Sequence, residues 1–245
     1  SEPGSGSDLA SLKTKAVDNG EHYIVNGQKT WTTLGQFANK IFCLVKTDTN
    51  CKPQNGISFL MIDIDSPGIE VRPIITLDGE HEVNEVWLKE VKVPKENLLG
   101  EENKGWTYAK YLLTHERTGI AGVPNSKSAI NHLKVIANKT YKNGKPLIED
   151  PLFSSQVAEL EIDLKAMEIF NLRAISSAES GKAPVMESSL LKIKGSIIRQ
   201  KTSDLLRKAI GPQALPYISE QFDEGWNQET VGPEYAGPLA KQYFI

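Results

Sequence analysis

The hydrophobic and polar positions of the chain change their period near residue 103. Before it, short runs rich in Val, Ile, Phe and Trp are separated by polar turns that contain Asn, Asp, Gly and Pro. Such spacing predicts an antiparallel β-barrel or sandwich rather than βαβ units. The Asn26–Gly27 dipeptide predicts a hairpin turn, and the strands expected after it cover residues 40–48, 56–65, 68–74 and 84–94.

After residue 103 the apolar positions recur with a helical period. Pro124 predicts a break, Asp150 an N-cap and Gly211 a helix end. The helices expected on this basis cover residues 104–123, 126–141, 150–180 and 187–210. We therefore expect an α+β chain: a β-domain over residues 1–103, then an up-down four-helix bundle over residues 104–245 with an irregular tail.

Composition removes several classes of function. The chain has 245 residues, of which 39% are hydrophobic and 24% charged, and its net charge of −3 comes from interspersed charges. A nucleic-acid partner is therefore not expected, and no apolar run approaches the ~18 residues of a membrane helix. Cys43 and Cys51 are the two cysteines, without a CxxC motif, so we expect neither a disulfide framework nor a metal site, and a cytoplasmic location.

The chain opens with the glycine-rich stretch SEPGSGSDLA. Gly4 and Gly6 permit positive φ angles and close approach of the backbone to another group. Ser7 offers a hydroxyl and an N–H to an anion or an amide. The stretch therefore suits a binding loop, although a solvated linker has the same composition.

An aromatic residue and threonines lie together in the stretch GQKTWTT. On a strand Trp31 and Thr33 share a face, because alternate side chains point to the same side. An aromatic plane can cover a flavin ring while the hydroxyl donates to a ring heteroatom. An ordinary tryptophan of a sheet core is the alternative.

A carboxylate falls on the apolar stripe of the first predicted helix. Glu116 follows Leu112 and Leu113 at helical spacing, and burial would raise its pKa towards that of a general base working near neutral pH. A salt bridge, for example to Arg173, or exposure at the edge of the stripe would also fit. Arg117 lies about 100° further around the helix and can line the same cavity.

Four stretches resemble the flavin-dependent acyl-CoA dehydrogenases, in family order and spacing: SEPGSGSDLA, GQKTWTT, EVNEVWLKEVKVPKENLLGEENKGW and HERTGIAG. The resemblance covers nearly the whole chain, and it is closest to bacterial pimeloyl-CoA dehydrogenase large subunits. Family members also carry an all-helical domain before the first stretch and a flavin-contacting segment after the position of Ile245. We expect this chain to lack both.

The resemblance implies FAD as cofactor and assigns roles to individual residues. Glu116 occupies the position of the catalytic base in a minority similar to isovaleryl-CoA dehydrogenases; in most members the base is a glutamate beyond the position of Ile245. Arg117 is implied in substrate binding, and Ser7 lies near the thioester. The flavin contacts implied are Ser1, Gly6, Ser7, Trp31, Thr32 and Thr33, with Thr33 near N5.

The implied reaction is α,β-dehydrogenation of an acyl-CoA thioester to a trans-2-enoyl-CoA. The implied partners are an electron-transferring flavoprotein and further subunits in a homo- or hetero-oligomer. Two family segments that contact the neighbouring subunit's flavin read YKNGKPL and KAIGPQALPY here, so those contacts are not expected in their usual form. A non-catalytic assembly subunit and an acyl-CoA oxidase are the alternative functions.

Overall fold

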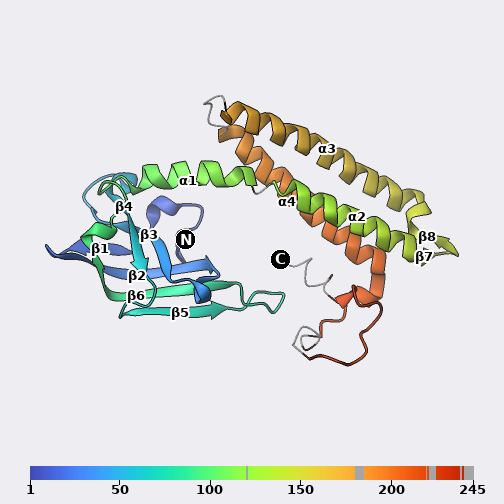
Figure 1. Cartoon of the computed structure of the whole chain (residues 1–245), viewed down its shortest axis with the longest axis horizontal. Helices are drawn as coiled ribbons and strands as arrows, with labels where there is room; N and C mark the ends of the chain where they lie inside the picture. Colours follow the sequence, from blue (N-terminus) through green and yellow to red (C-terminus); the bar gives the residue numbers. More distant parts are fainter. Residues whose placement is uncertain (120, 180–184, 219, 221–224, 238, 240–245) are drawn as a thin grey trace. The chain divides into compact units, whose positions relative to one another are not determined.

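The structure, a computed structural model, describes residues 1–119, 121–179, 185–218, 220, 225–237 and 239. For residues 114–118, 178–179 and 185 it describes the backbone alone. The chain divides into two compact units, Ser1–Leu112 and Leu113–Ile245. A β-sheet in the first unit and helices in the second confirm the predicted α+β class (Figure 1). The domain boundary near residue 103 stays a prediction.

The first unit contains one six-stranded sheet with the order β4-β3-β1-β2-β6-β5. Every neighbouring pair in it is antiparallel except β1–β3, which is parallel. Four of these strands lie where the sequence predicts them, whereas the short β1 was not predicted. The strands are β1 (Lys15–Asp18), β2 (His22–Thr33), β3 (Lys40–Lys46), β4 (Ile57–Asp63), β5 (Ile69–Ile74) and β6 (Val83–Pro94).

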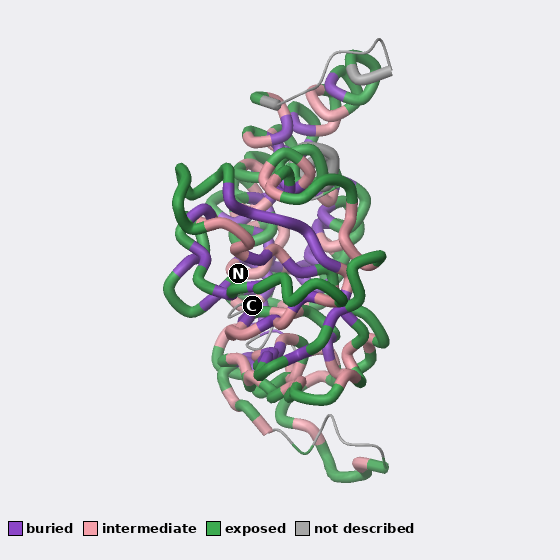
Figure 2. The backbone as a smooth tube through the Cα atoms, turned by 90° about the vertical axis from the view of Figure 1, so that its left-hand side faces the viewer, coloured by how far each residue is buried: buried purple, intermediate pink, exposed green. Residues whose placement is uncertain are grey.

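Buried residues of the sheet form the core of this unit; buried residues are purple in Figure 2. Val25, Val45, Leu60, Val86 and Val91 are each fully buried there. They come from four strands, on which alternate positions share a face. Val86 and Val91, five residues apart on β6, are both buried because a bulge between them shifts the alternation by one residue. Burying such aliphatic side chains contributes about 1.5–3 kcal/mol each.

The predicted hairpin turn at Asn26–Gly27 is wrong, because β2 continues through both residues. The turn that joins β1 to β2 lies at Asn19–Gly20, where Gly20 has a φ of 102° and the Asn19 N–H donates to the His22 carbonyl at 3.1 Å. Asn26 instead faces the partner strand β6. Its side chain donates to the Glu90 carboxylate at 2.6 Å and accepts from the Glu90 N–H at 2.9 Å.

Two β-bulges interrupt the pairing of β2 with β6, one on each strand. Between the pairs Val25–Val91 and Gly27–Leu88, β6 carries the extra residue, and Glu90 there has a φ of 51°. Between Lys29–Val86 and Thr32–Asn84 the extra residue is on β2, where Trp31 has a φ of 61°. A bulge breaks the alternation of side chains and increases the local twist, so the two ends of β2 do not share one register.

Within the described residues four α-helices follow the sheet along the chain, and they carry the labels α1 to α4 in Figure 1. The Asp150 carboxylate accepts from the N–H groups of Leu152 and Phe153 at 3.0 and 3.1 Å, which confirms the predicted N-cap. Pro124 lies in the first turn of the second helix, and Gly211, with a φ of 67°, follows the fourth. The helices are α1 (Gly105–Gly119), α2 (Val123–Lys139), α3 (Pro151–Glu179) and α4 (Val185–Ile210).

Short elements complete the described parts of both units. The hairpin of β7 (Tyr141–Lys142) and β8 (Lys145–Pro146) turns at Asn143–Gly144, both with positive φ angles, as a two-residue turn of this kind requires. The 3₁₀ turns are Leu9–Ser11, Gly35–Phe37, Pro53–Gly56, Lys95–Asn97, Leu147–Glu149 and Gly211–Ala214.

The core of the second unit lies between α2, α3 and α4. Leu133, Leu160, Leu191 and Ile198 are among its most deeply buried side chains. Gly195 on α4 faces the backbone of Ala121, where an added Cβ would lie 2.8 Å from the carbonyl oxygen. None of the helices in the described ranges is long and apolar enough to cross a membrane.

We expect Gly27→Ala to destabilise the β-sheet unit by about 2 kcal/mol or more, because an added methyl group overpacks the interior. A Cβ at Gly27 would lie 2.4 Å from the Thr14 hydroxyl oxygen and 2.7 Å from its Cα atom. Thermal and denaturant unfolding measure the effect. Gly6→Ala is the matched control, since a Cβ there meets nothing within 4 Å; equal stability of the two variants would contradict the packing argument.

Candidate functional site

The opening stretch is bound to the sheet rather than being a solvated linker. The Ser1 carbonyl accepts from the Thr30 N–H at 3.0 Å, and the main chains of Glu2 and Ser5 exchange two hydrogen bonds at 3.1 Å. These bonds close a turn over Pro3 and Gly4 and place Ser1 beside β2, one residue from Trp31. Two of the predicted flavin-binding stretches are thus brought together.

The glycines of this turn do not use the conformational freedom expected of them. Gly4 and Gly6 lack a positive φ, and both are exposed with nothing within 4 Å of an added Cβ. Ser7 is also exposed. Their backbones are therefore open to an approaching ligand, but among the residues that the structure describes no contact requires glycine at either position.

A buried ion pair, which the sequence does not predict, anchors the turn. Glu2 and Lys29 are 7% and 6% exposed, and the Lys29 ammonium donates to the Glu2 carboxylate and to the Leu44 carbonyl, both at 2.7 Å. The carboxylate also accepts from the N–H groups of Lys13 and Thr14 at 2.6 and 3.0 Å and from the Thr14 hydroxyl at 2.5 Å. Each charge therefore has a partner and several hydrogen bonds, which burial demands.

These donors determine the protonation of Glu2. Burial raises the pKa of its carboxyl group, but the hydrogen bond and the charge of Lys29, followed by the bonds from Thr14 and Lys13, outweigh burial and lower the pKa from 4.5 to about 2. Glu2 is consequently a structural anion at neutral pH and not a general base. A carboxylate and a lysine 27 residues apart carry no local sequence signal of their pairing.

Trp31 lies at the bulge of β2 and is not a core residue. Its side chain is 59% exposed, and its φ of 61° is uncommon for an aromatic residue. Strained backbone of this kind costs about 1–3 kcal/mol and occurs preferentially at functional sites. Thr33, two residues on, is exposed, and Thr32 is half-buried. The Trp31 indole is therefore not part of the hydrophobic core, and hydroxyl groups lie next to it along the strand.

These residues fit the flavin that the resemblance implies. An isoalloxazine ring needs an aromatic or apolar surface and a few hydrogen-bond donors at its edge, which Trp31, Thr33 and the neighbouring Ser1 offer. The buried hydroxyl of Ser5, 2% exposed, has no hydrogen-bond partner within the described residues, and such orphaned groups are uncommon unless a ligand or water satisfies them. The donor set is neutral and aromatic, as that ring requires.

Glu116 and Arg117 lie in the last turn of α1, but their side chains are outside the described residues. Leu112 and Leu113, which share the predicted apolar face, are 41% and 37% exposed in the isolated chain. The burial of Glu116, its role as a base and the role of Arg117 therefore stay predictions.

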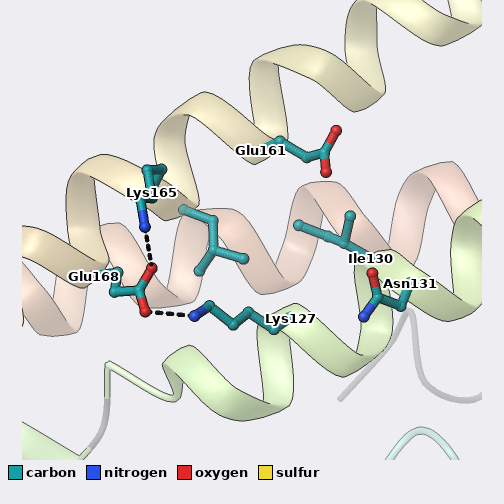
Figure 3. Close-up of a pocket in the computed structure, with 7 residues that line it drawn as sticks. Lys127, Ile130, Asn131, Glu161, Lys165 and Glu168 are labelled. Atoms are coloured by element: carbon teal, nitrogen blue, oxygen red, sulfur yellow. Dashed lines mark hydrogen bonds and ion pairs between the residues drawn. The ribbon is translucent and has the colours of Figure 1, made fainter.

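The other polar groups that the structure describes are less suited to catalysis or to binding a cofactor. A groove of about 270 Å³ between α2 and α3 is lined by charged side chains (Figure 3). In it Glu168 pairs with Lys127 and Lys165, and Glu161 with Lys134, so its charges are matched. Elsewhere burial raises the pKa of the Cys43 thiol. In the part of the chain that the structure describes, no group of His, Cys, Asp and Glu has the geometry to hold a metal ion.

Comparison with known proteins agrees with the fold and these motifs. The sequence profile of "Acyl-CoA dehydrogenase, middle domain" matches residues 1–91, and that of "Acyl-CoA dehydrogenase, C-terminal domain" matches residues 103–238. The chain therefore belongs to the acyl-CoA dehydrogenase family.

Individual relatives are similar over much of the chain. Acyl-CoA dehydrogenase FadE29 of Mycobacterium tuberculosis is 32% identical over 88% of the chain, which spans 55% of that relative. An acyl-CoA dehydrogenase from Geobacillus kaustophilus superposes with a TM-score of 0.82 at 30% identity, over 99% of this chain and 60% of that one. The ChsE4-ChsE5 complex of M. tuberculosis gives 0.81 at 29% identity, with the same coverages. The chain thus spans little more than half the length of these relatives.

We expect the stabilisation from Glu2 to be fully present above about pH 4.5 and to be lost as the pH falls through about 2, because the pKa is lowered on folding. The difference in unfolding free energy between the wild type and Glu2→Gln should shrink by roughly 2 kcal/mol over this window. Chemical denaturation at a series of pH values measures it.

Glu2→Gln leaves Lys29 buried without its carboxylate, so the double variant with Lys29→Met is the control. It should lose less stability at neutral pH than the two single changes together. A stability difference between wild type and Glu2→Gln that does not change with pH would contradict the assignment.

Proposed function

We propose that the protein is an FAD-dependent acyl-CoA dehydrogenase subunit that removes the α and β hydrogens of an acyl-CoA thioester to give a trans-2-enoyl-CoA. Family membership supports this reaction class. The observation that carries the proposal is the Thr30–Ser1 hydrogen bond, which joins the opening turn to the strand bearing the exposed Trp31.

The residues of this site would hold the flavin by complementary surfaces. The Trp31 indole offers a plane to the ring, and the Thr33 hydroxyl a hydrogen bond near N5. Ser1, Gly6 and Ser7 would contact the flavin from the opening turn, and Ser7 would also lie near the thioester of the substrate. Thr32, on the same strand as Trp31 and Thr33, would provide a further contact to the flavin. FAD, when bound, supplies the acceptor for the β-hydride.

Glu116 would remove the α-proton of the substrate, and Arg117 would bind the acyl-CoA beside it. Hydrogen bonds to the thioester carbonyl acidify that proton, so a carboxylate in a dry pocket suffices as the base. The assignment rests on the position of Glu116 in HERTGIAG and on the helix that the structure confirms for this stretch up to Gly119.

Reduced cofactor must be reoxidised, and an electron-transferring flavoprotein is the partner that the family resemblance supports. A second subunit, identical or different, is also proposed. The similarity to the ChsE4-ChsE5 complex, an assembly of two named chains, supports a subunit that works together with another.

We expect Trp31→Ala to weaken FAD binding by about tenfold or more, because stacking on an aromatic side chain is worth about 1–3 kcal/mol. Titration of FAD, followed by the quenching of its fluorescence, measures the affinity. Trp87→Ala is the matched control: Trp87 is another exposed tryptophan of the same sheet, 37% exposed, with the Arg72 guanidinium 5.1 Å from its ring centroid. Equal affinities of the two variants would remove Trp31 from the site, and a wild-type chain that binds no FAD would contradict the proposed cofactor.

We expect Glu116→Gln to retain FAD but to slow bleaching of the flavin by acyl-CoA about 100-fold or more, since a general base contributes about 10²–10⁴ in rate. Anaerobic stopped-flow absorbance measures the rate, with Glu101→Gln as the control. Bleaching at the wild-type rate would show that the base is another residue. No bleaching in the wild type would favour an assembly subunit, and rapid reoxidation by air an oxidase.

A further inference from the structure

The strained segment around Trp31 must be held in place by its neighbours, and one buried side chain does so. Asn84 on β6 is fully buried. Its amide nitrogen donates to the Thr32 carbonyl at 3.0 Å and to the Gln36 side-chain oxygen at 2.7 Å, and its amide oxygen lies 2.7 Å from Nε2 of His81. The Asn84 side chain therefore bonds to the end of β2, to the turn that follows β2 and to the segment before β6.

The acceptor at Thr32 determines the orientation of this amide. A backbone carbonyl can only accept, so the nitrogen of Asn84 must face Thr32 and its oxygen must face His81. Nε2 of His81 must then carry a proton and donate to Asn84. Both N–H groups and the carbonyl of the amide are used, so the network has a single consistent arrangement.

The segments around Asn84 are also bonded to one another and closely packed. Gln36 donates to the His81 carbonyl at 3.1 Å, and the Leu34 N–H donates to the Glu82 carbonyl at 2.7 Å. A Cβ on Gly35 would lie 3.3 Å from the Asn84 amide nitrogen and 3.3 Å from the Thr32 methyl group. The end of β2, the turn that follows it and the segment before β6 are thus joined by these two hydrogen bonds and by the Asn84 amide.

We propose that Asn84 is a positioning residue for the cofactor site, a role that rests on the proposed flavin function. It holds the Thr32 carbonyl, and with it the backbone between Trp31 and Thr33, in the bulged geometry that exposes both side chains. The exposed indole contributes nothing to the sheet core, so the geometry that Asn84 maintains serves the exposed face rather than the packing beneath it.

Asn84→Asp is the informative variant, because the shape is kept while a carboxylate cannot donate to the Thr32 carbonyl. The control is Ser58→Ala, which removes the hydrogen bonds of another fully buried side chain: the Ser58 hydroxyl accepts from the Asn103 N–H at 2.7 Å and pairs with the Thr47 hydroxyl at 2.6 Å. Ser58 lies on β4, from which β3 and β1 separate β2 in the sheet. Both variants are compared in the full chain.

Three readouts separate positioning from general destabilisation. We expect Asn84→Asp to weaken FAD binding about tenfold, to change the visible circular dichroism of FAD at saturation, and to accelerate amide hydrogen exchange over residues 29–37. Ser58→Ala should leave the spectrum at saturation and the exchange of this segment as in the wild type, at a comparable loss of melting temperature.

Unchanged exchange and an unchanged saturated spectrum in Asn84→Asp would overturn the proposal. If the wild-type chain does not bind FAD, the proposed function fails, and exchange over residues 29–37 alone decides whether Asn84 holds the bulge. If Asn84→Asp does not fold, His81→Ala, which removes only the outer bond to the amide oxygen, takes its place with the same readouts and a smaller expected change.

Discussion

The buried pair of Glu2 and Lys29 is the interaction on which the geometry of the β-sheet unit depends. Its hydrogen bonds reach the segment before β1, the middle of β2 and the backbone of β3. A buried charge whose partner is removed costs several kcal/mol, so these three segments cannot separate independently. Thr14 transmits the constraint further, because its hydroxyl donates to Glu2 while its Cα atom packs against Gly27. Glycine at position 27 is thus a consequence of how the opening turn is anchored.

The anchoring of the opening turn explains why the hairpin turn predicted at Asn26–Gly27 is not formed. The chain contains four Asn-Gly pairs, and three of them lie in connections between strands, at residues 19–20, 55–56 and 143–144. The fourth, Asn26–Gly27, lies inside β2, where the glycine admits Thr14 and the asparagine satisfies the bulge at Glu90. Hydrophobic periodicity predicted β3 to β6 and the helices α1 to α4 of the described residues, but not β1, because it reports which face is buried. It contains no information about which close backbone contact a glycine serves.

The sequence predicts residues for a flavin site, and those roles stay predictions, but it does not predict how the segments that carry them are arranged. Motif resemblance identified Ser1, Trp31 and Thr33, and the structure places the opening turn beside the strand that carries them. Glu2 with Lys29 and Thr32 with Asn84 are 27 and 52 residues apart, and a single sequence contains no signal for such pairs. The bulge at Trp31 was equally hidden, since an extra residue in a strand becomes visible only against its partner strand.

The two flanks of the exposed face are held by different chemistry. An ion pair anchors the opening turn, and its charges are buried and matched, so the field of each is largely cancelled by the other. A neutral amide holds the bulge on the other flank. The exposed groups of β2 between them include the Trp31 indole and the Thr33 hydroxyl, which are both uncharged. Redox potentials of bound cofactors respond to nearby charge. The opening turn and the bulge are thus each anchored by buried groups whose polar atoms are paired, and these anchors leave the Trp31 indole and the Thr33 hydroxyl exposed to an aromatic ligand.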